Sequence, residues 1–129
     1  MTQEEKDLLL KDICGRLPYS VKVYCSKYIG ILTLVSIDMD EDEVYIINRD
    51  DPMFSTYMET ETIKPYLFPL SSMTEELKEE HKDLLENQYH FDANGNVFTL
   101  QDFYCKYHID YRGLIPMGLA IDATGLNIY

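Results

Sequence analysis

The sequence predicts an α+β domain in which an N-terminal helix precedes an antiparallel β-meander and two further helices. The chain begins with an amphipathic stretch, short β-branched runs separated by turns follow over 21–63, and the periodicity becomes helical after residue 71. At 129 residues and 46% hydrophobic content, the chain has the size of one domain with its own core. No Ser/Gly-rich linker divides it, so we expect a single domain over 1–129, with a β-rich lobe (1–70) and a helical lobe (71–129).

The first helix is indicated by Thr2 and Glu5, which have the spacing of a capping box. Gly15 offers a stop for this helix. Its apolar face is expected to comprise Leu8, Leu9, Ile13 and Leu17.

Four runs predict strands, namely Val21–Cys25, Ile29–Ile37, Val44–Asn48 and Phe54–Ile63. Strands joined by tight turns favour an antiparallel meander. Leu119–Ile121 could add a fifth strand, and the alternative is that the strands close into a small SH3-like barrel. Pro65 and Pro69 predict that 63–70 has no regular structure and forms an extended or single-turn connector, because proline cannot donate to a sheet ladder.

Ser72 and Glu75 repeat the capping-box spacing and predict a second helix. Its buried stripe is expected to be Leu77, His81, Leu84 and Leu85. A third helix is predicted to begin at Thr99. Its inward side chains are expected to be Leu100, Phe103, Tyr104 and Tyr107. The tail 114–129 is interrupted by proline and glycine and is expected to be irregular.

The negative charge is concentrated in one segment. Between Asp38 and Glu61, nine acidic residues and a single base, Arg49, contribute −8 of the net charge of −12. The nine are Asp38, Asp40, Glu41, Asp42, Glu43, Asp50, Asp51, Glu59 and Glu61. A field of this sign repels phosphate backbones and anionic membranes, so we expect neither direct nucleic-acid binding nor membrane binding. It favours a protein partner with a basic surface, whereas the plainer alternative is that the charges only keep a strand edge soluble.

Three cysteines, Cys14, Cys25 and Cys105, form no close pair and predict reduced thiols. The acidic start lacks the basic and apolar regions of a secretory signal. No apolar run approaches the ~20 residues that span a bilayer. These features predict a cytoplasmic protein.

One motif occurs twice, as YHFDANG at Tyr89–Gly95 and, 18 residues later, as YHIDYRG at Tyr107–Gly113. We expect each copy to end a helix, with the histidine at the negative end of the dipole and the aspartate capping a turn. The alternative is a metal-dependent enzyme that uses the four polar side chains His90, Asp92, His108 and Asp110.

Other catalytic chemistry is not indicated. Asp38, Asp40 and Asp42 resemble the start of a calcium loop, but its sixth and twelfth positions are Glu43 and Arg49 instead of glycine and glutamate. Cys105 lies three residues before His108 and could form a nucleophilic thiolate beside it. We expect a simply buried cysteine instead, because that is the commoner case. No phosphate-binding loop, nucleophile elbow or zinc-protease motif occurs. The sequence therefore predicts no catalytic residue, metal or cofactor.

The second half of the chain carries a family resemblance. Ile63–Glu76 has the sequence IKPYLFPLSSMTEE, His108–Ile115 has HIDYRGLI, and Gly118–Ala120 has GLA. These blocks resemble a family of small uncharacterised proteins carried by bacteriophages and mobile elements of gut anaerobes. The resemblance implies a phage or mobile-element origin and a cytosolic home, and it brings no activity or site residue.

Together these features predict a non-catalytic acidic protein-binding module, such as a phage accessory or anti-defence factor. It would dock on a basic or nucleic-acid-binding surface of a partner protein, in one version as a nucleic-acid mimic. The metal-dependent enzyme and a structural phage component remain the alternatives.

Overall fold

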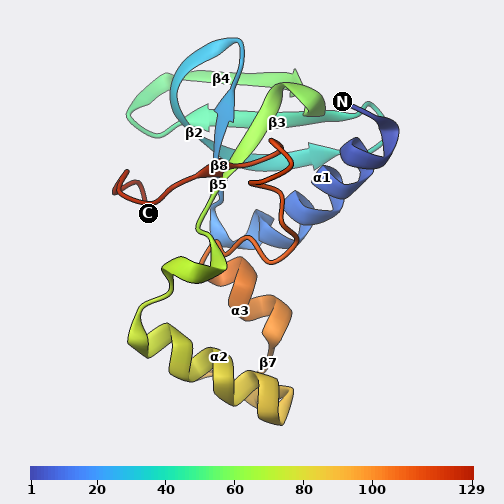
Figure 1. Cartoon of the computed structure of the whole chain (residues 1–129). Coiled ribbons are helices and arrows are strands. Elements are labelled where there is room, and N and C mark those ends of the chain that lie inside the picture. The colour runs from blue at the N-terminus through green and yellow to red at the C-terminus, as the bar shows by residue number, and fades with distance from the viewer.

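The computed structural model describes residues Met1–Tyr129 and has an α+β fold, as predicted (Figure 1). Its helices are α1 (Gln3–Arg16), α2 (Glu75–Asn87) and α3 (Leu100–Lys106). Its strands are β1 (Lys22–Cys25), β2 (Tyr28–Asp38), β3 (Glu43–Asn48), β4 (Asp51–Glu59), β5 (Ile63–Leu67), β6 (Tyr89–Phe91), β7 (Val97–Thr99) and β8 (Ile121–Asp122). Short 3₁₀ turns cover Leu17–Tyr19, Thr60–Thr62 and Leu70–Ser72. None of the helices has the length and apolarity that crossing a membrane requires.

The main sheet has the strand order β4-β3-β2-β1-β5-β8. Strands β1 to β4 form the predicted antiparallel meander, β5 returns to pair with β1 in the antiparallel direction, and β8 joins β5 in parallel. The long strand β2 pairs with two neighbours: its first half, Tyr28–Thr33, pairs with β1, and its second half, Thr33–Asp38, pairs with β3. Figure 1 shows β3 and β4 crossing the direction of β5. Hydrogen bonds do not close this curled sheet into a barrel, because β4 and β8 are its two edges.

The prediction that Pro65 excludes regular structure is wrong, because this proline lies inside β5. The Ser26 N–H donates to the Thr62 carbonyl at 2.9 Å, so these two residues form a hydrogen-bonded pair of the β1–β5 ladder. Hydrogen-bonded and non-hydrogen-bonded pairs alternate along an antiparallel ladder, so Val23 and Pro65, three positions further along, form a pair without hydrogen bonds between them. The proline nitrogen therefore points away from β1, toward the side of β8. Strand β8 pairs with β5 only from Tyr66 onward, so it does not pair with Pro65. At that position a strand needs no donor.

Helix α1 covers the inner face of the sheet. Its capping box is confirmed, since the Thr2 side chain accepts from the Glu5 N–H and the Glu5 carboxylate accepts from the Thr2 N–H, both at 3.0 Å. Leu9 and Ile13 are fully buried in a core of fifteen side chains between helix and sheet. The helix continues through Gly15 to Arg16, so the predicted stop is wrong. A Cβ at Gly15 would lie 3.4 Å from the Cys105 Sγ, so α3 packs directly against this position.

The helical lobe corrects two further expectations. The N-cap of α2 is Thr74 rather than Ser72, whose hydroxyl donates to the Pro69 carbonyl at 2.7 Å. Leu84 is buried as predicted, whereas Leu85 is 57% exposed and does not belong to the buried stripe. Helix α3 begins after Thr99 as predicted. The second core consists of Leu84, Phe98, Phe103 and Ile109.

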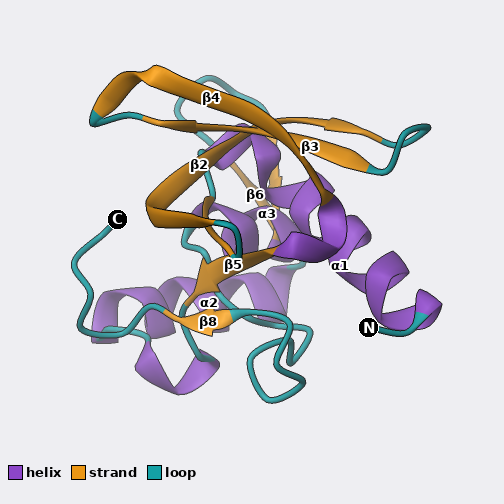
Figure 2. Cartoon of the chain, turned by 90° about the horizontal axis from the view of Figure 1, so that it is seen from above, coloured by secondary structure: helices purple, strands orange, loops and turns teal.

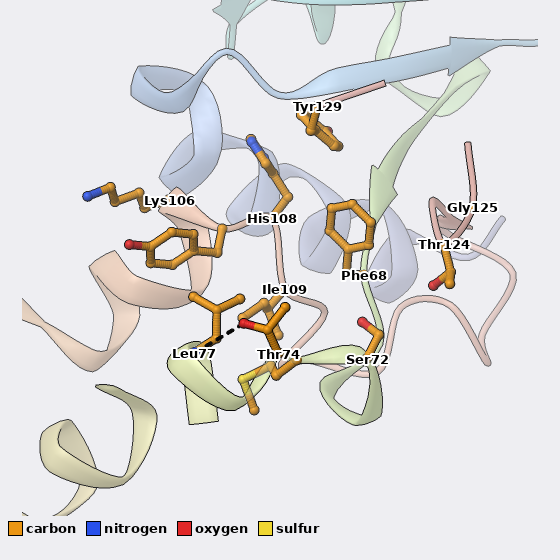
Figure 3. Close-up of a pocket in the computed structure, with 12 residues that line it drawn as sticks. Phe68, Ser72, Thr74, Leu77, Lys106, His108, Ile109, Thr124, Gly125 and Tyr129 are labelled. Atoms are coloured by element: carbon orange, nitrogen blue, oxygen red, sulfur yellow. Dashed lines mark hydrogen bonds between the residues drawn. The ribbon is translucent and has the colours of Figure 1, made fainter. Parts of the chain in front are cut away.

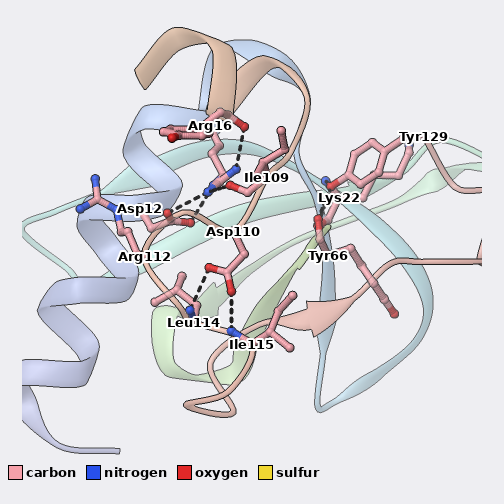
Figure 4. Close-up of polar contacts among 11 residues, drawn as sticks. Asp12, Arg16, Lys22, Tyr66, Ile109, Asp110, Arg112, Leu114, Ile115 and Tyr129 are labelled. Atoms are coloured by element: carbon pink, nitrogen blue, oxygen red, sulfur yellow. Dashed lines mark hydrogen bonds and ion pairs between the residues drawn. The ribbon is translucent and has the colours of Figure 1, made fainter. Parts of the chain in front are cut away.

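A buried ion pair within α1 makes further contacts that join the two lobes (Figure 4). On α1, Arg16 and Asp12 are almost fully shielded from solvent, and the Arg16 Nε lies 2.8 Å from the Asp12 Oδ2. The Arg16 guanidinium also donates to the Ile109 carbonyl at 2.6 Å and to the Tyr104 carbonyl at 3.3 Å. The Arg112 Nε lies 3.2 Å from the Asp12 Oδ1. Both carboxylate oxygens of Asp12 are therefore paired, and the contacts fix the end of α3 against α1.

Candidate functional site

The structure brings seven of the nine predicted acidic residues to one end of the sheet. These seven, which we call the acidic end, are Asp38, Asp40, Glu41, Asp42, Glu43, Glu59 and Glu61. Asp50 in the β3–β4 turn and Asp51, the first residue of β4, lie instead at the opposite end of this strand pair. Figure 2 shows β3 and β4 side by side with turns at both ends. A six-residue strand separates the two groups by roughly 20 Å, so the nine carboxylates do not form one continuous patch.

Three carboxylates of the acidic end form a row across neighbouring strands. Asp38 on β2 is paired with Glu43 on β3, and Glu43 is paired with Glu59 on β4. Paired residues lie on the same face of a sheet and only about 5 Å apart, so this row places like charges directly opposite one another. That arrangement opposes folding unless a cation neutralises it.

The next row of the same face is aromatic. Tyr45 and Tyr57 are cross-strand partners two residues along from Glu43 and Glu59, and their ring centroids are 4.8 Å apart. Tyr57 is 62% exposed. This face therefore combines a carboxylate row with an exposed aromatic surface.

The turn between β2 and β3 is held by its own acidic side chains. The Asp38 carboxylate accepts from the backbone N–H groups of Asp40 and Glu41, each at 3.1 Å. Asp42 forms an ion pair with Lys6 of α1. The hydrogen bond to Asp42 raises the pKa of Lys6, and the charges of nearby carboxylates raise it further. Lys6 is the one base that forms an ion pair with the acidic end, which keeps a large negative excess.

The two copies of the repeated motif have different structures. The first forms β6 and the turn after it, which corrects the expectation that it ends a helix, and the second follows α3 directly. Each aspartate does cap a turn as predicted. Asp92 accepts from the Asn94 N–H at 2.9 Å, and Asp110 accepts from the Leu114 N–H at 2.8 Å.

The four polar residues of the motif do not converge. His90 stacks on Phe98 in the hairpin, whereas His108 stacks on Tyr129 beside β5. No group of three or more His, Cys, Asp or Glu side chains is arranged to hold a metal ion, either here or at the aspartates of the β2–β3 turn. Cys105 is 3% exposed, and burial raises the pKa of its thiol, in agreement with a buried cysteine.

Sequence reasoning missed a cavity at the junction of the two lobes (Figure 3). This junction cavity has a volume of about 470 Å³ and is bounded by the end of β5, the start of α2, the end of α3 and the tail. Its apolar lining consists of Phe68, Met73, Leu77, Tyr107, Ile109 and Tyr129. Because these residues come from four separate segments, no local pattern in the sequence indicates that they meet.

His108 forms part of the cavity wall. Its carbonyl accepts from the Phe68 N–H at 2.7 Å, and the Asp110 N–H donates to the Phe68 carbonyl at 2.8 Å, so the backbone is fixed beside β5. Its φ of +57° lies in the left-handed region, which is unusual for residues other than glycine. The side chain is 9% exposed and makes no hydrogen bond, and its Nδ1 is buried without a partner.

The electrostatic surroundings keep His108 neutral. Burial, followed by the charges of Arg16 and Lys22, lowers the pKa of His108 to about 4. Its ring lies against that of Tyr129, with centroids 3.6 Å apart and planes inclined by 15°. The Tyr129 hydroxyl donates to the Tyr66 carbonyl at 2.7 Å and accepts from the Lys22 N–H at 2.9 Å. These two bonds hold the tail across β1 and β5, and burial raises the pKa of the Tyr129 phenol.

Comparison of the chain with protein-family models, curated proteins and solved structures found no match. The resemblance to phage-borne proteins therefore stays a prediction.

Proposed function

We propose that this chain is a non-catalytic protein-binding module that docks through its acidic end on a basic surface of a partner protein. The observation that carries the proposal is the row formed by Asp38, Glu43 and Glu59 on three adjacent strands. Like charges directly opposite one another in a sheet are destabilising by a few tenths of a kcal/mol to about 1 kcal/mol per pair. Lysine and arginine side chains of a partner would relieve this repulsion on binding.

The surroundings of the row have the composition of an interface. Tyr57 beside the row is 62% exposed, and Met39 in the β2–β3 turn is 60% exposed. Tyrosine and methionine are enriched at the centres of protein interfaces, where they supply apolar contact area, while charged groups occupy the rim. The tyrosine pair and Met39 would then supply contact area, and the carboxylates would supply orientation and a fast association rate.

Nucleic-acid-binding surfaces are the strongest candidates for the partner. Such surfaces carry lysine and arginine side chains spaced to meet phosphates, and a rigid row of carboxylates offers them the same charge. This chemistry supports an accessory or anti-defence factor that occupies the nucleic-acid site of a host or phage protein.

Two triple variants with equal net charge test the proposal. Glu41→Gln, Glu43→Gln and Glu59→Gln alter the acidic end, whereas Glu76→Gln, Glu79→Gln and Glu86→Gln alter exposed positions of α2. Partners would be captured from infected cells by each protein and identified by mass spectrometry. We expect the partner to be lost with the first triple variant and retained with the second, and binding to weaken as salt rises from about 50 to about 300 mM.

Retention of the same partner by both triple variants would show that docking does not use the acidic end. If the first triple variant keeps the partner but self-associates, the carboxylates only protect the edge strand β4 from pairing.

A further inference from the structure

The junction cavity has the dimensions of a small-molecule site. Its volume of about 470 Å³ lies within the ~300–1,000 Å³ that is usual for ligand pockets. It lies where the two lobes meet, and the contacts of Arg16 with the end of α3 fix the lobes against each other. The walls are therefore formed before any ligand arrives.

The walls favour a flat apolar body. Figure 3 shows Phe68 and Tyr129 on one side and Leu77 on the other, with Ile109 between them. The ring centroids of Phe68 and Tyr129 are 5.8 Å apart at an inclination of 56°, and Tyr107 adds a third aromatic surface. Aromatic rings pack best against other rings in offset or edge-to-face arrangements, so an aromatic ligand would gain more here than an aliphatic chain of equal area.

The charge of the cavity is opposite to that of the molecule. The chain has 23 acidic residues and a net charge of −12, yet no Asp or Glu lines the cavity. Lys106 lines it and forms no ion pair. Its ammonium group lies 5.3 Å from the centroid of the Tyr107 ring and 5.5 Å from that of Phe98, and Figure 3 shows it directed away from the cavity. A flexible four-carbon stem allows this group to turn toward an anion at the cavity mouth.

The polar side chains of the cavity wall differ in whether they form hydrogen bonds within the protein. Ser72 donates to the Pro69 carbonyl, and Thr74 accepts from the Leu77 N–H as the N-cap of α2. His108 is nine-tenths buried, and its imidazole makes no hydrogen bond within the chain. Residues with a positive φ are often found at functional sites, where surrounding contacts hold the strained backbone in place.

We propose that the junction cavity binds a small aromatic anion, whose rings lie among Phe68, Tyr107 and Tyr129 and whose carboxylate or sulfonate meets Lys106. This site is separate from the acidic end, and its existence does not depend on the protein-binding function proposed above.

A pair of fluorescent probes tests the site. 8-Anilinonaphthalene-1-sulfonate is an aromatic anion, and N-phenyl-1-naphthylamine has the same rings without the sulfonate. We expect the intact chain to bind both in a saturable manner with one site per chain. Lys106→Gln should weaken binding of the anionic probe about tenfold and change binding of the neutral probe less than twofold. Lys82→Gln on the exposed part of α2 is the matched control and should change neither.

Filling the cavity tests the location. Leu77→Trp should weaken binding of both probes at least about tenfold, because the indole occupies the volume that the rings require. Since Leu77 also packs on the second core, Thr124→Trp at the exposed rim serves as a second blocking variant. Circular dichroism would verify the fold of each variant. Undiminished binding of both probes by a folded Leu77→Trp or Thr124→Trp protein would overturn the site. Equal losses for both probes in Lys106→Gln would overturn its preference for an anion.

Discussion

Glu43 on β3 is the cross-strand partner of Glu59 on β4, so two carboxylates face each other across one strand pair. The two residues are distant in the sequence, and the hairpin brings them together. The core residues Val44 and Ile46, which alternate with Glu43 and Tyr45 along β3, fix which face the carboxylates occupy. The charged row is therefore a consequence of the register, and the register is determined by burial.

The first prediction concerns the stability of this pair. Glu59→Gln should raise the free energy of unfolding by about 0.5 kcal/mol, because it removes a like-charge contact with Glu43. Glu86→Gln on α2, which has no ion pair to lose, is the control and should have a smaller effect. Urea unfolding at low salt measures the difference, and about 1 M salt should largely remove it. A lower stability for Glu59→Gln would contradict the repulsion.

The second prediction concerns the buried ion pair within α1. Asp12→Ala should lower the free energy of unfolding by about 3–5 kcal/mol, because it leaves the guanidinium of Arg16 buried without a counter-charge. Lys11→Ala, at the exposed neighbouring position, should change stability by less than about 0.5 kcal/mol. Chemical denaturation measures both. A loss below about 1 kcal/mol in Asp12→Ala would show that water replaces the carboxylate.

The third prediction concerns the tail. Tyr129→Phe should lower the free energy of unfolding by about 1–3 kcal/mol, because the Tyr66 carbonyl and the Lys22 N–H lose the hydroxyl that they bind. Tyr89→Phe is a suitable control, since Tyr89 is 49% exposed and its hydroxyl has no partner in the protein. Thermal unfolding of the two variants under identical conditions measures the effect. Equal melting temperatures would mean that the tail does not hold the sheet.

The fourth prediction concerns pH. Folding lowers the pKa of His108 from the ordinary 6.5 to about 4, so between these values the unfolded chain binds a proton that the folded chain does not. The free energy of unfolding should therefore fall as the pH is lowered through this window, by up to about 3 kcal/mol from this group. Above about pH 6.5 the group should have no effect, because the imidazole is neutral in both states.

His108→Asn isolates this contribution, because asparagine tolerates the left-handed backbone and does not titrate. The variant should show a shallower decline of stability between about pH 6.5 and about pH 4 than the wild type. His90→Asn, on the exposed hairpin, should keep the contribution of His108. If the pH dependence of His108→Asn matches that of the wild type, the histidine titrates alike in the folded and unfolded chains.

Features set by neighbouring residues could be predicted from the sequence. The capping box of Thr2 and Glu5 and the start of α3 after Thr99 depend on contacts within three residues, and both are confirmed. The meander was predictable because short β-branched runs between tight turns pair with their neighbours. The same local rules failed at Ser72, whose hydroxyl bonds the Pro69 carbonyl and leaves Thr74 as the N-cap.

Features set by distant residues could not be predicted in this way. Pro65 fits in β5 because its nitrogen faces away from β1 and β8 does not pair with β5 at this residue, and the local sequence does not reveal this arrangement. Asp50 and Asp51 are close to the other acids in the sequence but lie at the far end of the β3–β4 pair. The junction cavity depends on four segments meeting, and His108 could be noticed only as part of the repeated motif.

The contacts of Arg16 have a consequence for how the molecule opens. Carbonyls at the end of a helix lack partners within the helix, and near the end of α3 the carbonyls of Tyr104 and Ile109 each accept from Arg16 of α1 in addition to one backbone N–H. The second core has only four buried side chains, so the helical lobe has little buried apolar area to stabilise it once its contacts with α1 are lost. Slow amide exchange in α1 and α3 should therefore report a single cooperative opening, and residues 71–129 expressed alone should stay largely unfolded.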